Sequence, residues 1–254
     1  MSSIRVRSLT YDVPGKRILD NINLDIESGE ILSIMGQSGS GKTTLLKLLT
    51  GLRRPTSGSI LIDDVDIALL SEQELDKVRL KMGLVFQYAA LFDSLSVYDN
   101  IVFGVVRHRR GVPRKELDAT VDSLLEEVGL PGLGGRMPSE LSGGQQKRIG
   151  LARALAMKPS LVFYDEPTSG LDPITAVTID DLITSTRNHN QVTSVVVSHH
   201  LPSIFRISDR IAMLDKGRVV CAGTPTELLN SENAAVQRFI QPERGALTQP
   251  DARI

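Results

Sequence analysis

The chain has 254 residues, of which 41% are hydrophobic and 23% charged, and its formal net charge is −1. This balance is ordinary for a globular protein and argues against a general nucleic-acid binder, which would need a strongly basic surface. Cys221 is the single cysteine, so no disulfide can form within the chain, which fits a reducing compartment such as the cytoplasm. We expect no membrane helix and no signal peptide, because no apolar run approaches about 20 residues.

The first thirty residues are predicted to form a small lobe of antiparallel strands. Apolar and polar residues alternate over Ile4–Val6 and Ile22–Ile26, with turn signals at Pro14-Gly15 and Ser28-Gly29. We place Tyr11 in the loop after the first strand, where its ring could either stack on an adenine base or pack on the lobe.

A glycine-rich loop follows the apolar strand predicted over Ile31–Met35 and precedes a helix predicted from Thr44. It fits the phosphate-loop pattern GxxxxGK[ST] at every fixed position. The glycines let successive backbone N–H groups point inward, at the positive end of a helix dipole, so a nucleoside triphosphate is the expected ligand. Lys42 would reach the β- and γ-phosphates and the Thr43 hydroxyl would bind Mg²⁺. The predicted phosphate-binding residues are Gly36, Gln37, Ser38, Gly39, Ser40, Gly41, Lys42, Thr43 and Thr44.

The next part of the chain returns to short strands and then changes to helices. A capping box, Ser71-Glu72-Gln73-Glu74, starts a short helix before an apolar strand at Met82–Phe86. From Gln87 to about Pro159 the expected elements are capped helices, one of them over Arg114–Val128 and ended by Gly129. This pattern predicts a helical lobe inserted into an α/β domain.

After residue 160 the strands and helices alternate again. An apolar strand over Leu161–Tyr164 ends at Asp165-Glu166, a helix is predicted over Ile174–Arg187, and another buried strand over Thr193–Val197. The alternation predicts a sheet covered by helices. The segment from Gln241 has little apolar content, so we expect it to be mobile unless a partner orders it.

The stretch Leu141-Ser142-Gly143-Gly144-Gln145 precedes a helix predicted over Gln146–Met157. It provides a second helix N-terminus suited to an anion. A nucleotide is bound by a single phosphate loop, so the presence of a second anion-binding helix N-terminus in the same chain requires an explanation.

Taken together, these stretches resemble the nucleotide-binding subunit of ABC transporters over residues 4–240. The signature Leu141–Gln145 matches in full, Gln87 follows a strand end as the Q-loop glutamine does, and Leu161–Glu166 resembles the Walker B strand. The resemblance implies an α/β fold, with a P-loop NTPase (RecA-like) core at 1–87 and 160–240. It also implies an N-terminal antiparallel β lobe, a helical subdomain at about 88–159 and a C-terminal tail at 241–254.

The resemblance also implies roles for single residues. Asp165 would bind Mg²⁺ with Thr43 and Gln87, while Glu166 would act as the general base and His199 as the switch histidine beside the γ-phosphate. Lys42 and Gln87 complete the implied catalytic set. Two copies would associate head to tail, so that Ser142, Gly143, Gly144 and Gln145 of each copy cap the ATP held by the other.

Two residues depart from the family pattern, and a basic run has two interpretations. His200 stands where the family often has Asp, and Lys147 stands where Gln is frequent. The run Arg107–Arg110 is either a solvated helix end or a contact for anionic lipid headgroups.

Within the family, three segments look like the ATPases of the Mla and Mce phospholipid-transport systems: Tyr88–Asn100, Met137–Glu140 and Asp172–Thr175. We therefore predict a subunit on the cytoplasmic face of the inner membrane, attached through permease subunits that handle the phospholipid. Ala89–Phe92 is predicted to dock on the permease or, alternatively, to pack in the helical lobe.

Other functions stay open at this point. ABC importers of small solutes such as amino acids share every ATPase motif quoted above. Non-transport ABC ATPases that act on DNA or ribosomes usually fuse two cassettes or carry a long coiled coil, and this chain shows neither. A P-loop GTPase or kinase is disfavoured by the complete signature and by the lack of an Asn-Lys-x-Asp motif.

Overall fold

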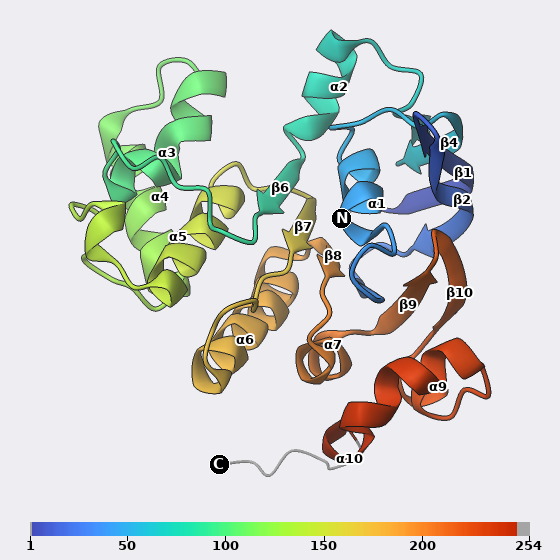
Figure 1. Ribbon diagram of the computed structural model, residues 1–254. Helices are drawn as coiled ribbons and strands as arrows, with labels where there is room; N and C mark the ends of the chain where they lie inside the picture. The colour runs from blue at the N-terminus through green and yellow to red at the C-terminus, as the bar shows by residue number, and fades with distance from the viewer. Residues whose placement is uncertain (1, 248–254) are drawn as a thin grey trace.

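The computed structural model describes residues 2–247, which form two sheets and a group of helices (Figure 1). The smaller sheet has the strand order β2-β1-β4-β5, and its neighbours are antiparallel. Its strands are β1 (Ile4–Val13), β2 (Lys16–Ile26), β4 (Ser57–Ile62) and β5 (Val65–Asp66).

The larger sheet has the order β10-β9-β3-β8-β7-β6, and only β10 runs antiparallel to its neighbour. Its strands are β3 (Ile31–Met35), β6 (Met82–Val85), β7 (Leu161–Asp165), β8 (Thr193–Val197), β9 (Arg210–Asp215) and β10 (Arg218–Gly223). All five residues of β3 are buried, as expected for a central strand with both faces covered. Because parallel strands end at one edge, the loops after β3, β6, β7 and β8 gather there.

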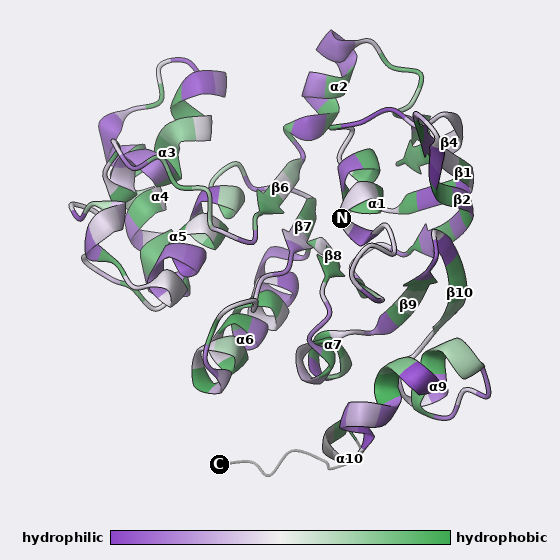
Figure 2. Cartoon of the chain, viewed as in Figure 1, coloured by the Kyte–Doolittle hydropathy of each residue, from purple (hydrophilic) through white to green (hydrophobic). Residues whose placement is uncertain are grey.

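Two helix groups cover this framework. Helix α1 (Lys42–Leu49) packs with both sheets in one apolar cluster, and another cluster, which we call the third apolar cluster, joins β9 to the C-terminal helices. The remaining helices of this part are α2 (Glu72–Arg79), α6 (Pro173–Asn190), α7 (Leu201–Ile207), α8 (Pro225–Leu229), α9 (Ala234–Ile240), η2 (Gln241–Glu243) and α10 (Arg244–Leu247). Figure 2 shows β10 largely in the apolar colour and α2 largely in the hydrophilic one, in keeping with Leu75 as the one buried residue of α2.

A second group of helices stands to one side of the sheet in Figure 1. It consists of α3 (Val97–His108), α4 (Arg114–Glu127), η1 (Pro138–Glu140) and α5 (Gly143–Leu155). Their buried residues form a cluster that continues into β7 and α6, so the group is anchored on the core. The expected α/β fold with an antiparallel lobe and an inserted helical subdomain is confirmed.

Several predicted boundaries need correction. Tyr11 lies within β1 and not in a loop after it, because β1 continues to Val13 through register shifts. The helix after the phosphate loop begins at Lys42, and the signature helix begins at Gly143, because Ser142 is its N-cap. The predicted capping box at Ser71 is present.

Within the C-terminal segment that we expect to be mobile, residues 241–247 form η2 and α10, and the mobility of the segment stays a prediction. Leu247 packs against the third apolar cluster, and Arg244 donates to the carbonyl oxygen of Leu229 at 3.1 Å. The rest of that segment, residues 248–254, lies outside the described part of the chain. None of the helices within residues 2–247 has the length and apolar character needed to cross a membrane.

Candidate functional site: a phosphate loop beside two carboxylates

The phosphate loop joins the end of β3 to the start of α1. Its three glycines all have positive φ angles: 152° at Gly36, 80° at Gly39 and 109° at Gly41. A Cβ atom at Gly36 would collide with the carbonyl oxygen of Leu214, and one at Gly41 would lie 2.7 Å from a methyl group of Leu19. All three glycines are therefore favoured by their backbone conformation, and Gly36 and Gly41 also by the close approach of neighbouring atoms.

Lys42 folds back over this loop. Its ammonium group donates to the carbonyl oxygens of Gly36 at 2.7 Å and of Gln37 at 3.2 Å. Burial lowers the pKa of Lys42, against the charges of Glu166 and Asp165, which raise it. The ammonium is thus a desolvated cation, whose attraction for an anion is little weakened by water.

The phosphate loop also contains a buried polar atom without a hydrogen-bond partner among the described residues. Ser40 is buried, and its hydroxyl oxygen has no hydrogen-bond partner among the described residues. Such orphaned groups in native proteins call for an explanation, and a bound polar ligand is one. Curled glycine backbone, a desolvated lysine and a free hydroxyl together fit the phosphates of a nucleotide.

Asp165 ends β7, next to the start of α1. The Thr43 hydroxyl donates to its carboxylate at 3.3 Å. Burial raises the pKa of Asp165, and the hydrogen bond from Thr43 lowers it. Among residues 2–247, no group of three or more His, Cys, Asp or Glu side chains is placed to bind a metal alone. This suits Mg²⁺ in nucleotide sites, where phosphates and waters supply most ligands.

Glu166 follows directly and adopts a left-handed backbone conformation with φ of 51°. Its N–H donates to the Val197 carbonyl at 2.8 Å, which ties it to the end of β8. Its carboxylate oxygen Oε2 lies 2.8 Å from Nδ1 of His199 and accepts from the Ser198 hydroxyl at 3.2 Å. A left-handed non-glycine residue costs on the order of 1–3 kcal/mol and is typical of functional sites.

The side chains of Glu166 and His199 differ in their exposure to solvent. The side chain of Glu166 is 12% exposed, whereas that of His199 is 60% exposed. The carboxylate is therefore enclosed by the protein, whereas the imidazole is open to solvent.

Gln87 follows β6 at the same edge of the sheet. Its amide nitrogen donates to the hydroxyl of Ser169 at 3.3 Å, in the loop that follows Glu166. The structure thus connects Gln87 with the Glu166 loop, while its expected contact with Mg²⁺ stays a prediction.

The signature segment keeps its hydrogen bonds local. Ser142 accepts from the N–H of Gln145 at 3.3 Å, and the Gln145 side chain accepts from the N–H of Ser142 at 2.9 Å, which completes a capping box. Ser142 and Gly143 are exposed, whereas Gly144 packs so closely on Thr175 that a Cβ would lie 2.6 Å from its methyl group. One chain therefore presents an outward-facing helix N-terminus apart from its own phosphate loop.

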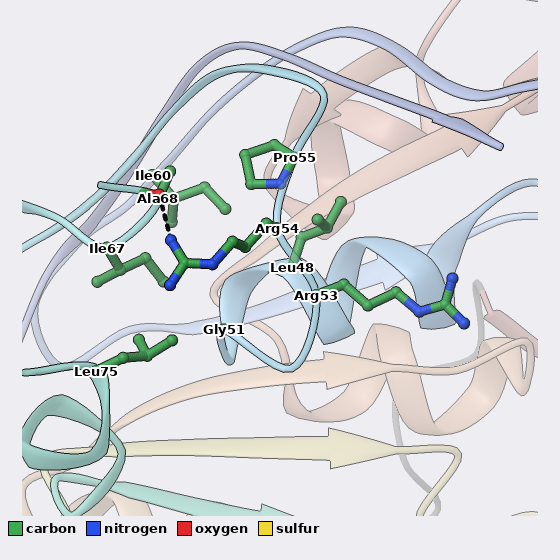
Figure 3. A pocket seen from close by; sticks show the side chains of 9 residues that line it. All are labelled: Leu48, Gly51, Arg53, Arg54, Pro55, Ile60, Ile67, Ala68 and Leu75. Atoms are coloured by element: carbon green, nitrogen blue, oxygen red, sulfur yellow. Dashed lines mark hydrogen bonds between the residues drawn. The ribbon is translucent and has the colours of Figure 1, made fainter. Parts of the chain in front are cut away.

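Tyr11 lies on the same side of β1 and β2 as Leu19, with which it is paired across the strands. Leu19 covers Gly41, so Tyr11 belongs to the surroundings of the phosphate loop. Figure 3 shows Arg54 crossing a pocket next to α1 to reach the Ala68 carbonyl, whereas Arg53 points away from that pocket. Arg53 donates to the Tyr11 hydroxyl at 2.6 Å. Stacking of Tyr11 on adenine stays a prediction.

The predicted docking segment needs one correction. Ala89 is buried and Leu91 packs against the core of the helical group, so both contribute to packing. Ala90 and Phe92 of this segment are exposed, as is the preceding Tyr88 at 84%, and the ring centroids of Phe92 and Phe103 are 4.6 Å apart.

Sequence reasoning missed two contributors to the site. Ser198 donates to Glu166, and no sequence signal distinguishes it from other serines at strand ends. Lys147 was noted only as a departure from the family pattern, although it lies at helical spacing between the buried Gly144 and Leu151. That spacing is a signal that the lysine points inward.

A phosphate loop between strand and helix, with a carboxylate pair at the end of another parallel strand, defines a P-loop nucleoside triphosphatase. Within that class, the model of the ABC transporter family matches residues 19–169. The chain therefore belongs to the ABC transporter family and is an ATPase subunit of that kind.

Individual relatives agree with this placement. The intermembrane phospholipid transport system ATP-binding protein MlaF of Haemophilus influenzae is 42% identical over 94% of this chain and 90% of its own length. The methionine import ATP-binding protein MetN of Carboxydothermus hydrogenoformans is 41% identical over 93% of this chain and 71% of its own. The dimeric post-hydrolysis structure of the ATP-binding cassette MJ0796, bound to ADP and Pi, aligns with a TM-score of 0.80 at 33% identity, over 87% of this chain and 98% of that one.

Proposed function

We propose that this chain powers the movement of phospholipids by a membrane permease, through ATP hydrolysis at a site centred on Glu166. The catalytic part of this proposal rests on the position of the Glu166 carboxylate. Ser198 and His199 hold it at the edge of the sheet from which the phosphate loop also extends. A positioned carboxylate of this kind can take a proton from an attacking water.

The other residues divide into phosphate, metal and sensing roles. Lys42 and the loop amides bind the β- and γ-phosphates, and His199 faces the γ-phosphate. Thr43 and Asp165, with Gln87, would hold Mg²⁺, which supplies charge neutralisation on the phosphates. These assignments follow the geometry given above and the family pattern.

The exposed signature supports a head-to-tail dimer of two copies. Ser142 and Gly143 lie exposed at the N-terminus of α5, where the capping box between Ser142 and Gln145 uses the Ser142 N–H within the chain. The positive end of the α5 dipole would then bind the γ-phosphate of the ATP held by a second copy. The relation to the dimeric MJ0796 cassette supports the same arrangement.

The phospholipid cargo rests on two observations. The segments Tyr88–Asn100, Met137–Glu140 and Asp172–Thr175 resemble the Mla and Mce ATPases, and the MlaF relative is similar over nearly the whole chain. Tyr88 and the contacting pair Phe92 and Phe103, which we call the docking surface, are exposed aromatic side chains that could receive an apolar cytoplasmic helix of the permease. The subunit would then sit at the cytoplasmic face of the inner membrane.

The test is the ATPase rate of the complex purified with its permease and placed in lipid. We expect the rate to respond to the phospholipid composition of the bilayer, and the Glu166→Gln complex to be inactive in every lipid. A rate that ignores phospholipids but rises with an amino acid would overturn the cargo assignment.

Import of an amino acid is the second candidate, because the MetN relative is almost as similar as MlaF over this chain. The same purified complex separates the two functions, since an importer would respond to methionine or a related solute. Both candidates use the same ATPase site, so Glu166→Gln is the shared negative control.

A further inference from the structure

Lys147 makes an unusual contact from the signature helix α5. Its side chain is buried, and its ammonium group donates to the carbonyl oxygens of Pro167 at 2.9 Å and Ser169 at 2.6 Å. Both carbonyls belong to the loop that directly follows Glu166. The ammonium group of Lys147 is therefore shielded from water and hydrogen-bonded to two backbone carbonyl groups.

Burying the Lys147 ammonium group costs desolvation free energy, so the arrangement calls for an explanation. Burial lowers the pKa of Lys147, and the negative charge of Glu166 is the one group that raises it. The neutral glutamine frequent at this position in the family would avoid most of the desolvation cost. A lysine here provides a longer reach and charge-assisted hydrogen bonds, which are about twice as strong as neutral ones.

The loop held by Lys147 is tied to the catalytic edge at several points. The N–H of Ser169 donates to the Glu166 carbonyl at 3.2 Å, and the Ser169 hydroxyl accepts from Gln87. Glu166 itself is in the left-handed conformation, which the chain adopts only when its neighbours fix it. Lys147 is the contact that fixes this loop from α5.

Helix α5 carries two further features, one near each of its ends. Its N-terminus carries the exposed Ser142 and Gly143, and near its C-terminus Arg153 donates to the carbonyl oxygens of Ala89 and Ala90 at 2.9 and 2.7 Å. The N-terminus of α5 is therefore the proposed cap for a second nucleotide. The same helix contacts the loop after Glu166 and the segment next to the docking surface.

We propose that Lys147 is a positioning residue for Glu166, a role that rests on the proposed catalytic site. It fixes residues 167–169 to the signature helix, so that engagement of the signature and alignment of the carboxylate occur together. Without it, residues 167–169 lose these two hydrogen bonds to α5, while the phosphate loop, on β3 and α1, keeps its shape.

Lys147→Met in the full chain tests this, because methionine keeps the apolar stem and removes the charge. We expect kcat for ATP hydrolysis to fall roughly 10–100-fold, as for small misplacements of a reacting group, with KM changed less than about threefold. Lys147→Gln, which still donates, should lose less activity than Lys147→Met.

Arg148→Met is the matched control. Arg148 is the next residue on α5 and also donates to two backbone carbonyls, at 3.2 Å to Val128 and 3.4 Å to Gly129, but these lie away from Glu166. Its kcat should stay within about twofold of wild type if the effect of Lys147 is on catalysis. Equal losses in the two variants would show that Lys147 only stabilises α5, and the proposal would fail.

A second readout separates this inference from the proposed site. In a Glu166→Gln background, adding Lys147→Met should cause no further loss of rate, because the lysine acts through the missing base. If Glu166→Gln hydrolyses ATP normally, the site assignment itself is wrong. If Glu166→Gln is inactive and Lys147→Met has wild-type kcat, the site stands and the role of Lys147 is refuted. Should Lys147→Met not fold, Lys147→Leu decides, because leucine also removes the donor, and wild-type kcat in that variant counts against the proposal.

Discussion

Asp180 is a buried carboxyl whose ionisation should limit the stability of the protein. It lies on the inner face of α6, 3% exposed, and its Oδ1 atom has no hydrogen-bond partner within residues 2–247. Burial raises the pKa of Asp180 from 3.8 to about 6, although Ser203 and the charge of Arg206 lower it. The neighbouring Asp181 adds to the rise.

The magnitude and sign follow from this pKa. A rise from 3.8 to about 6 corresponds to about 3 kcal/mol at about 1.36 kcal/mol per pKa unit. Because the folded-state pKa is the higher one, this contribution is fully present below pH ~4 and is lost as pH rises through about 6. At pH 8 the folded protein holds an unfavourable buried charge. Asp180→Asn removes that charge and should stabilise the fold by roughly 1–3 kcal/mol, less than the full amount because the new amide also needs partners.

Urea unfolding of the nucleotide-free full chain at pH 5, 7 and 8 measures this effect. The stabilisation by Asp180→Asn should grow from pH 5 to 8. Asp181→Asn is the control, because that carboxylate is exposed and paired with Arg206 at 2.8 Å, and it should change stability by less than about 1 kcal/mol. A stabilisation that is absent at pH 8, or independent of pH, would show that Asp180 is not the strained group described here.

Four further outcomes are expected at the nucleotide site and the docking surface. Lys42→Ala should weaken ATP binding at least about tenfold in calorimetry, since charge-assisted hydrogen bonds contribute about 1.5–3 kcal/mol each; unchanged affinity would contradict its role. Glu166→Gln should bind ATP normally but hydrolyse it roughly 10²–10⁴ times more slowly, and normal turnover would remove it as the base. Sedimentation should show ATP-dependent dimers of Glu166→Gln that the added Ser142→Arg abolishes, whereas surviving dimers would rule out capping by the signature. Tyr88→Glu should release the subunit from permease-containing membranes and leave ATP binding intact. Leu91→Glu should also disturb the core, because Leu91 packs against it. A Tyr88→Glu subunit that stays attached to the membranes would show that docking occurs elsewhere.

Much of the fold could be predicted because its signals are local. The phosphate loop has a fixed spacing of glycines, the buried strand Ile31–Met35 is continuously apolar, and the cap at Ser71 lies next to its partner in sequence. Each of these features depends on residues within a few positions of one another. They therefore appear in the sequence before any tertiary contact is known.

The errors arose where tertiary contacts decide. Tyr11 continues β1 because β2 and β4 pair with that strand through register shifts, which no local pattern encodes. Residues 241–247 form η2 and α10 although the segment from Gln241 has little apolar content, and Leu247 packs against an apolar cluster that lies far away in the sequence. The exposed part of the docking surface likewise depends on how α3 packs, since it places Phe103 beside Phe92.

The site shows a further limit of sequence reasoning, and it explains why two copies are needed. Motifs identify Ser142 and Glu166 as separate groups, but only the structure shows that Lys147 joins their elements through hydrogen bonds from α5 to the Glu166 loop. In one chain the N-terminus of α5 is exposed at Ser142 and Gly143, while the rest of the helix packs on the core. A nucleotide held by a second copy would fix that end, and Lys147 would carry the restraint to the loop of the base. Hydrolysis would then require both copies in place, because each Glu166 is aligned by a helix whose free end binds the other copy's nucleotide.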